Sequence, residues 1–300
     1  MRMLNAIRRP EPSLSFEFYP PRDGADFGPL AERASRLTAL GADFVSVTYG
    51  AGGGAAGRRE ASARALAVLA TVSDAPRLAH LTLAGHSRDD LTRIIGQFLA
   101  DGAEGFMALR GDPPGGSRAQ WQPTPGGLTY ASELVALVRE LTDQPIGVAA
   151  FPHGHPSARS LAHDADVLAR KQAAGADFAL SQVVLDAGAY FGLVERARQA
   201  GASLPIVPGI MPLSRSVRRE RLELFSGAPL PRGLAELLDG TDDLGERDRA
   251  GLDWTVDLVR ELLAGGAPGV HFYTVTSSAA TEAVCLRLGF KSGDSQRHPK

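Results

Sequence analysis

Glu17 is the first residue whose type and position suggest chemistry. It lies in the stretch 13–22, SLSFEFYPPR, which predicts a short strand because phenylalanine and tyrosine favour strands and a proline pair removes ladder donors. A carboxylate buried among aromatic residues is costly unless it is paired or protonated. Glu17 is therefore a candidate functional residue. The simpler interpretation places it on the solvent face of a half-buried strand.

Other polar side chains follow apolar runs elsewhere in the chain. They are Thr48, His80, Arg110, Asp112, His153, His155, Gln182 and Tyr273. The pair His153 and His155 has the spacing of a metal site in a barrel hydrolase, with His80 and Asp112 as the obvious further ligands. We expect no metal, because imidazoles in a loop more often contact a ligand or cap a helix.

Two further features have both a functional and a structural interpretation. The glycines at 50 and 52–54 could offer N–H groups to a phosphate, but no lysine follows in P-loop spacing and a flexible loop fits equally well. Asp164, Arg170 and Lys171 share a predicted helix, and the two cations near its carboxyl end also suit the helix dipole. The chain has no G-x-S-x-G motif on which a serine nucleophile could rest.

Strands and helices alternate along the chain and would position these residues. Strands are predicted at 13–19, 44–50, 78–83, 105–110, 146–151, 178–185, 205–212 and 270–275. Helices are predicted at 26–40, 58–71, 88–100, from about 130, 158–174, after the sixth strand, over 216–263 as one longer helical region, and up to about 288. This alternation predicts parallel pairing with right-handed crossovers.

The count of eight strands indicates a single-domain α/β protein with a (β/α)8 TIM barrel. No G-x-G-x-x-G follows the first strand, which argues against an open dinucleotide-binding sheet. We expect residues 1–12 to form an N-terminal extension, 13–290 the barrel and 291–300 a frayed tail. Gly41, Gly102 and Gly175 each follow a predicted helix, where a left-handed cap is wanted.

The composition narrows the class of protein. The 300 residues are 44% hydrophobic and carry a net charge of −2, without a Lys/Arg cluster, so neither nucleic acid nor a membrane surface is an expected partner. One cysteine excludes an intrachain disulfide framework. No apolar run is long enough to span a membrane, and a cytoplasmic protein is expected.

In a barrel of this kind the active site lies at the carboxyl ends of the strands. The polar residues named above fall at those predicted ends, so the barrel would bring them together. A scaffold needs few such groups there for stability. Their convergence predicts an active site.

Five sequence blocks, in order along the chain, resemble the methylenetetrahydrofolate reductase family. They are SFEFYPPR at 15–22, VSVTYGA at 45–51, ALRGD at 108–112, PGIMP at 208–212 and HFYT at 271–274. The resemblance implies a (β/α)8 barrel and, since the chain stops after it, a bacterial-type enzyme without a regulatory domain. It also implies reduction of 5,10-methylenetetrahydrofolate to 5-methyltetrahydrofolate, with NAD(P)H reducing FAD and the flavin passing hydride to the folate.

Under this resemblance three residues have roles in the reaction. Glu17 would be the general acid that protonates the departing ring nitrogen, its pKa raised by apolar neighbours. Asp112 resembles the aspartate beside the flavin and the pterin, where it would bond the folate and tune the flavin. Gln182 resembles the glutamine that touches the substrate ring and the nicotinamide.

The same matching implies a set of FAD contacts, in which Arg170 and Lys171 would meet the pyrophosphate. The set is Thr48, His80, Leu109, Arg110, Gly111, Asp112, Tyr130, Ala131, Phe151, His155, Asp164, Arg170 and Lys171. Val167, Val183-Val184-Leu185, Arg218 and Ser277 depart from the family pattern. Arg218 would suit the glutamate carboxylates of folate and replace the arginine missing at Ser277.

Three alternatives stay open at this point. The same reaction could proceed by direct hydride transfer without flavin. A metal-dependent barrel hydrolase and a non-catalytic folate- or flavin-binding protein belong to other classes. The choice between NADH and NADPH and the oligomeric state are also open.

Overall fold

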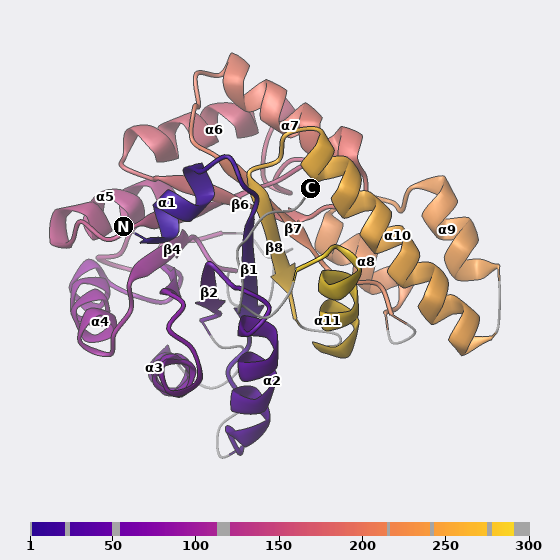
Figure 1. Ribbon diagram of the computed structural model, residues 1–300. Helices are drawn as coiled ribbons and strands as arrows, with labels where there is room; N and C mark the ends of the chain where they lie inside the picture. Colours follow the sequence, from indigo (N-terminus) through magenta and orange to yellow (C-terminus); the bar gives the residue numbers. More distant parts are fainter. Residues whose placement is uncertain are drawn as a thin grey trace.

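A closed barrel of eight parallel strands, in the chain order β1 to β8, forms the centre of the molecule (Figure 1). The computed structural model describes residues 2–21, 25–49, 55–112, 121–214, 217–240, 243–274 and 278–290, the side chains of residues 55–58 excepted. The strands are β1 Ser13–Phe18, β2 Phe44–Val47, β3 Arg77–Thr82, β4 Gly105–Leu109, β5 Ile146–Ala150, β6 Phe178–Val183, β7 Ile206–Ile210 and β8 Gly269–Tyr273. The (β/α)8 fold expected from the sequence is confirmed.

Helices surround the strands. They are α1 Arg2–Arg8, α2 Gly28–Thr38, α3 Ala55–Val72, α4 Arg88–Ala100, α5 Ala131–Leu141, α6 Leu161–Ala173, α7 Ala187–Gln199, α8 Arg219–Ser226, α9 Arg232–Asp239, α10 Leu244–Ala264 and α11 Ser278–Arg287. The sequence predicted the bounds of α4 correctly, where Ser87 caps the helix by accepting from Asp90 N at 3.1 Å. The predicted left-handed glycines are confirmed, with φ of 93° at Gly41, 86° at Gly102 and 113° at Gly175.

The region 216–263, expected as one helical region, contains the three helices α8, α9 and α10. Gly227 ends α8 in the left-handed conformation, at φ 75°. Pro231 then stands at the N-cap of α9. Asp243 caps α10 by accepting from Gly245 N and Glu246 N. Local cap residues therefore divide a stretch whose apolar spacing alone is continuous.

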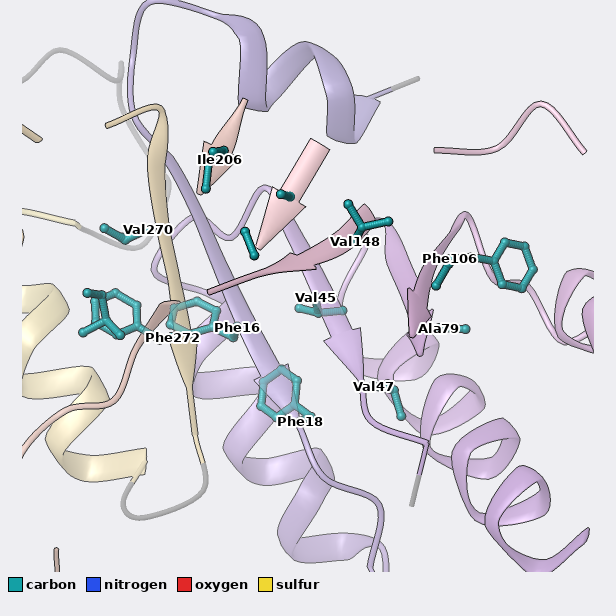
Figure 2. Packing of buried hydrophobic residues seen from close by; sticks show 14 of the residues in the cluster. Phe16, Phe18, Val45, Val47, Ala79, Phe106, Val148, Ile206, Val270 and Phe272 are labelled. Carbon is teal, nitrogen blue, oxygen red and sulfur yellow. The ribbon is translucent and has the colours of Figure 1, made fainter. Parts of the chain in front are cut away.

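The main core lies between the strands and the surrounding helices. Side chains alternate along a strand, so Phe16 and Phe18 of β1 point outward into this layer, beside Val45 and Val47 of β2 (Figure 2). Both phenylalanines are fully buried. Glu17, between them, must point to the opposite side, into the barrel.

The helix α1 closes the amino-terminal end of the barrel. In Figure 1 it lies across the end opposite the arrowhead of β8. Its buried Met3, Leu4 and Ile7 pack on residues of the barrel interior, among them Phe44 and Phe178. The segment expected to be an N-terminal extension thus supplies part of the interior packing at this end of the barrel. The expected tail, 291–300, lies outside the described residues, and none of the described helices combines the length and hydropathy needed to cross a membrane.

Candidate active site

A cavity of about 220 Å³ opens at the carboxyl end of the barrel. Its polar lining consists of Glu17, Tyr19, His80, Gln182 and Tyr273. Its apolar lining consists of Met107, Leu109, Ala149, Phe151, Leu180, Val183, Met211 and Phe225. A mostly apolar pocket with a few converging polar groups is the usual form of a small-molecule site.

The carboxyl group of Glu17 is buried against two imidazoles. Its Oε2 lies 3.4 Å from Nε2 of His80, without the alignment of a hydrogen bond, and 3.7 Å from Nε2 of His271. Only 4% of Glu17 is exposed. The register explains this meeting: Glu17 pairs with Tyr273 across β1 and β8, and Ser15 pairs with His271 two residues earlier.

The environment of Glu17 differs from the one expected from the sequence. Phe16 and Phe18 point away from its carboxyl group and do not surround it. Burial raises the pKa of Glu17, but the charges of His80 and His271 outweigh burial and bring the pKa below its ordinary value. Burial in turn lowers the pKa of His80, against the attraction of Glu17. The expectation that apolar neighbours raise the pKa of Glu17 was therefore wrong.

A distortion of β6 places Gln182 in the cavity. The register of β6 and β7 shifts between Leu180 and Val183, and such irregularities re-aim side chains near active sites. The carbonyl oxygen of Gln182 accepts from Ser181 Oγ at 2.8 Å, and its side-chain Oε1 accepts from Val183 N at 3.2 Å. Gln182 is thus a cavity residue, as its predicted role requires.

Tyr273 closes the cavity beside Glu17. Its hydroxyl donates to Ser181 O at 2.7 Å, and burial together with the Glu17 carboxylate raises its pKa. This ring needs a glycine next to it: a Cβ on Gly209 would lie 2.5 Å from Cε2 of Tyr273 and 2.3 Å from Ser181 O. The space left by Gly209 in β7 therefore allows the ring of Tyr273 to lie at the cavity.

A second polar cluster lies at the ends of β4 and β5 and on α6. Lys171 is buried and donates from Nζ to Ala149 O at 2.8 Å. Burial lowers its pKa to about 8, against the attraction of Asp164. Burial, Arg110 and Lys171 lower the pKa of His155 to about 4, and burial raises the pKa of Asp164.

The cluster holds two cations close together. Lys171 is repelled by Arg110 and attracted by Asp164, and Arg110 is attracted by Asp112. Nε of Arg110 and Oγ1 of Thr48 are buried without a hydrogen-bond partner among the described residues. Unsatisfied buried donors and neighbouring cations suit an anionic group.

The other predicted FAD contacts are spread over the rim. Leu109 and Phe151 line the cavity, and Gly111 adopts φ 80° at the end of β4. Asp112 is exposed beside Arg110, whose pKa it raises against the effect of burial. Tyr130 is 64% exposed just before Ala131, the first residue of α5.

Two predicted arginines are exposed and away from the cavity lining. Arg170 is exposed on α6, whereas Lys171, the next residue, is buried. Arg218 is the N-cap residue of α8. A different cation, Arg221, lies over the ring of cavity-lining Phe225 at 5.4 Å and acts on the pKa of Tyr19. The departure Ser277 and the glycines at 50 and 52–54 lie outside the described residues.

Sequence reasoning missed His271, Tyr19 and Arg221 as site residues. His271 lies two residues before Tyr273 on β8, and period-two alternation could have placed both side chains inside the barrel. Arg221 gave no such signal, because its position depends on how α8 packs.

The geometry gives no support to the metal-hydrolase alternative. Within the described residues, no three His, Cys, Asp or Glu side chains converge in a way that could hold a metal ion. His153 faces Asp186 and Arg196, whose charges act on its pKa in addition to burial, whereas His155 belongs to the cluster around Lys171.

Comparison with known proteins agrees with the sequence blocks. The pattern of the family "Methylenetetrahydrofolate reductase" matches residues 2–289. The 5,10-methylenetetrahydrofolate reductase of Escherichia coli is 34% identical over 283 residues, which cover 94% of this chain and 92% of that protein. Methylenetetrahydrofolate reductase 1 of Schizosaccharomyces pombe is 30% identical over 96% of this chain but 48% of its own length.

Solved structures share the fold at low identity. A Clostridium thermocellum protein described as binding two copies of 5-methyl-5,6,7,8-tetrahydrofolic acid superposes with a TM-score of 0.63 at 14% identity, covering 96% of this chain and 98% of that one. A Xanthomonas albilineans dihydropteroate synthase gives 0.51 at 15% identity, with 94% and 93% covered. At such identities only the barrel is shared. The match over nearly the whole sequence goes further, and by it the chain belongs to the methylenetetrahydrofolate reductase family.

Proposed function

We propose that the chain reduces 5,10-methylenetetrahydrofolate to 5-methyltetrahydrofolate in the cavity beside Glu17, with NAD(P)H as the reductant. The observation that carries the proposal is a buried carboxyl group at the carboxyl end of a barrel that belongs to this family. The non-catalytic alternative gives no reason to keep such a group, since binding alone needs no buried acid.

The reaction requires a proton and a hydride. Protonation of the departing nitrogen opens the five-membered ring and breaks one C–N bond, which leaves an iminium carbon. Hydride addition to that carbon then forms the methyl group and converts NAD(P)H to NAD(P)+. We assign the proton to Glu17, because a positioned acid lowers the barrier of such a step. Gln182 and Asp112 would orient the folate ring.

We propose that the cluster around Lys171 binds FAD. The unsatisfied Arg110 Nε and Thr48 Oγ1 and the closeness of the two cations Arg110 and Lys171 support this assignment. FAD, when bound, would accept a hydride from the nicotinamide and deliver it to the folate. The chain's own part is to hold the phosphates with Arg110 and Lys171 and to keep water away with the apolar lining.

The glutamyl end of the folate carries carboxylates, for which an arginine is the natural partner. Arg218 remains the predicted contact. Arg221 is the second candidate, because it lies over cavity-lining Phe225. Either guanidinium would meet the tail of the substrate outside the cavity.

Oxidation of NADH and of NADPH, each followed at 340 nm with and without methylenetetrahydrofolate, tests the proposed reaction. We expect oxidation that depends on the folate. No folate-dependent oxidation with either nucleotide would contradict the proposal. Deuterium at C4 of the nicotinamide then separates the two routes: direct transfer carries the label into the methyl group, whereas a carrier that exchanges with water loses part of it.

A further inference from the structure

The backbone of Arg110 is fixed by the neighbouring strand. Ala84 N donates to Arg110 O at 3.0 Å, which continues the pairing of β3 and β4 beyond their ends. Gly111 then turns the chain at φ 80°, in a place where a Cβ would lie 2.9 Å from Cβ of Thr82. The Arg110 side chain therefore begins at a set position at the carboxyl end of the barrel.

The guanidinium at the far end of this side chain is less constrained. Its Nε is buried without a hydrogen-bond partner among the described residues. Asp112 attracts the guanidinium, whereas Lys171 and Arg110 repel each other. This repulsion favours conformations in which the guanidinium turns away from Lys171, and so away from an anion that both cations would bind.

The guanidinium lies over the ring of Trp121. Cζ of Arg110 is 5.0 Å from the ring centroid, within the range of a cation–π contact. Tryptophan attracts a cation more strongly than the other aromatic residues do, and a planar guanidinium can also stack on its ring. Trp121 thus supplies an attraction that opposes the repulsion from Lys171.

The segment that carries Trp121 is held against the turn between β3 and α4. Gly85 N donates to Thr124 Oγ1 at 3.1 Å, and Arg88 N donates to Gly126 O at 2.9 Å. Trp121 itself is partly buried and packs on the main core. The ring is therefore in place before any ligand binds.

We propose that Trp121 is a positioning residue, whose ring holds the guanidinium of Arg110 in the anion site against the repulsion of Lys171. The inference rests on the proposed FAD site and adds to it a residue that acts through Arg110. A diphosphate binds more tightly to cations that are already ordered, because the cost of ordering them is not taken from the binding free energy.

A double-mutant cycle tests whether Trp121 acts through Arg110. The whole protein, freed of cofactor, is titrated with FAD. Trp121→Leu should weaken FAD binding about tenfold, as expected for loss of a desolvated cation–π contact. In an Arg110→Met background the same change should weaken it less than about twofold further. An equal loss in both backgrounds would overturn the proposal, because Trp121 would then act without Arg110.

Two more variants separate the ring from its N–H group and from packing. Trp121→Phe keeps an aromatic face and should restore most of the affinity lost in Trp121→Leu. Trp254→Leu is the matched control: it removes the other tryptophan, which packs beside Gly233 of α9, and should leave FAD affinity within about twofold. A Trp121→Phe protein as weak as Trp121→Leu, or an equal loss in Trp254→Leu, would overturn the role of the ring.

A measurement without FAD keeps the test independent of the proposed cofactor. In ¹H–¹⁵N NMR of the cofactor-free protein, the ring current of Trp121 should move the Nε–H signal of Arg110 upfield, and Trp121→Leu should abolish this shift. An ordinary signal in a protein that binds FAD would refute the positioning role alone. A shifted signal in a protein that binds no FAD would refute the proposed cofactor alone.

Discussion

Replacement of Glu17 by glutamine changes the proposed chemistry with little change in shape. The amide has the volume of the carboxyl group and stays in a position that is 4% exposed. It cannot donate an acidic proton to the departing nitrogen. The apolar lining and Gln182 remain as they are, so the folate should still bind.

A general acid contributes about 10²–10⁴ in rate, or roughly 3–5 kcal/mol of barrier. Glu17→Gln should lower kcat by that factor while the folate KM changes less than about threefold. The stability should fall modestly, because the attractions of His80 at 3.4 Å and His271 at 3.7 Å outweigh burial and hold the pKa of Glu17 below its ordinary value, so the ionised group stabilises the fold and the neutral amide loses that contribution.

The assay is steady-state reduction of methylenetetrahydrofolate, followed from pH 6 to pH 9, with the melting temperature of each variant measured beside it. Glu104→Gln is the matched control: this glutamate pairs with Arg2 and Arg77 at the other end of the barrel, and its loss should leave kcat unchanged. A Glu17→Gln protein with a near wild-type rate would refute the assignment of the acid.

Three further predictions concern the folate tail, the flavin cluster and the floor of the barrel. Arg221→Ala should raise the folate KM about tenfold, because a charge-assisted hydrogen bond at the mouth of the cavity is lost. Arg218→Ala, measured in the same assay, shows which of the two arginines contacts the folate tail. Lys171→Met should weaken FAD retention about tenfold or more, measured as absorbance near 450 nm per chain, whereas Arg170→Met on the exposed side of the same helix should have a smaller effect. Ile7→Ala should lower the free energy of unfolding by about 2–4 kcal/mol in urea, because its side chain fills the floor of the barrel.

Each of these three predictions has an outcome that would contradict it. A folate KM that equals the wild-type value in both arginine variants would mean that neither arginine of α8 contacts the folate tail. Full flavin content in Lys171→Met would move the phosphate site away from the buried cluster. Arg8→Ala, on the exposed face of α1, is the control for the stability measurement, and an Ile7 variant as stable as this control would mean that α1 contributes little to the barrel.

The barrel could be predicted because its signals are local. Apolar runs separated by helical spacing identify the strands, and the glycines at 41, 102 and 175 mark where helices end. Gln182 lies near the carboxyl end of β6, so its place at the cavity could be expected from the strand, whereas its role in the reaction stays a prediction. The division of 216–263 was missed because the apolar spacing continues through Gly227 and Pro231.

The neighbours of Glu17 could not be read in the same way. The meeting of Ser15 with His271 joins residues 256 positions apart, and depends on closure of the barrel between β1 and β8. The sequence neighbours Phe16 and Phe18 gave the wrong environment because alternation sends them outward. The register shift in β6 has no local signature either, since it depends on the approach of β7 at Gly209.

The most direct test of the central claim is identification of the product. Purified protein incubated without oxygen with NAD(P)H and 5,10-methylenetetrahydrofolate should form 5-methyltetrahydrofolate, one molecule for each nucleotide oxidised, as measured by liquid chromatography and mass spectrometry. Unchanged methylenetetrahydrofolate, from folded protein supplied with FAD and both nucleotides, would contradict the account.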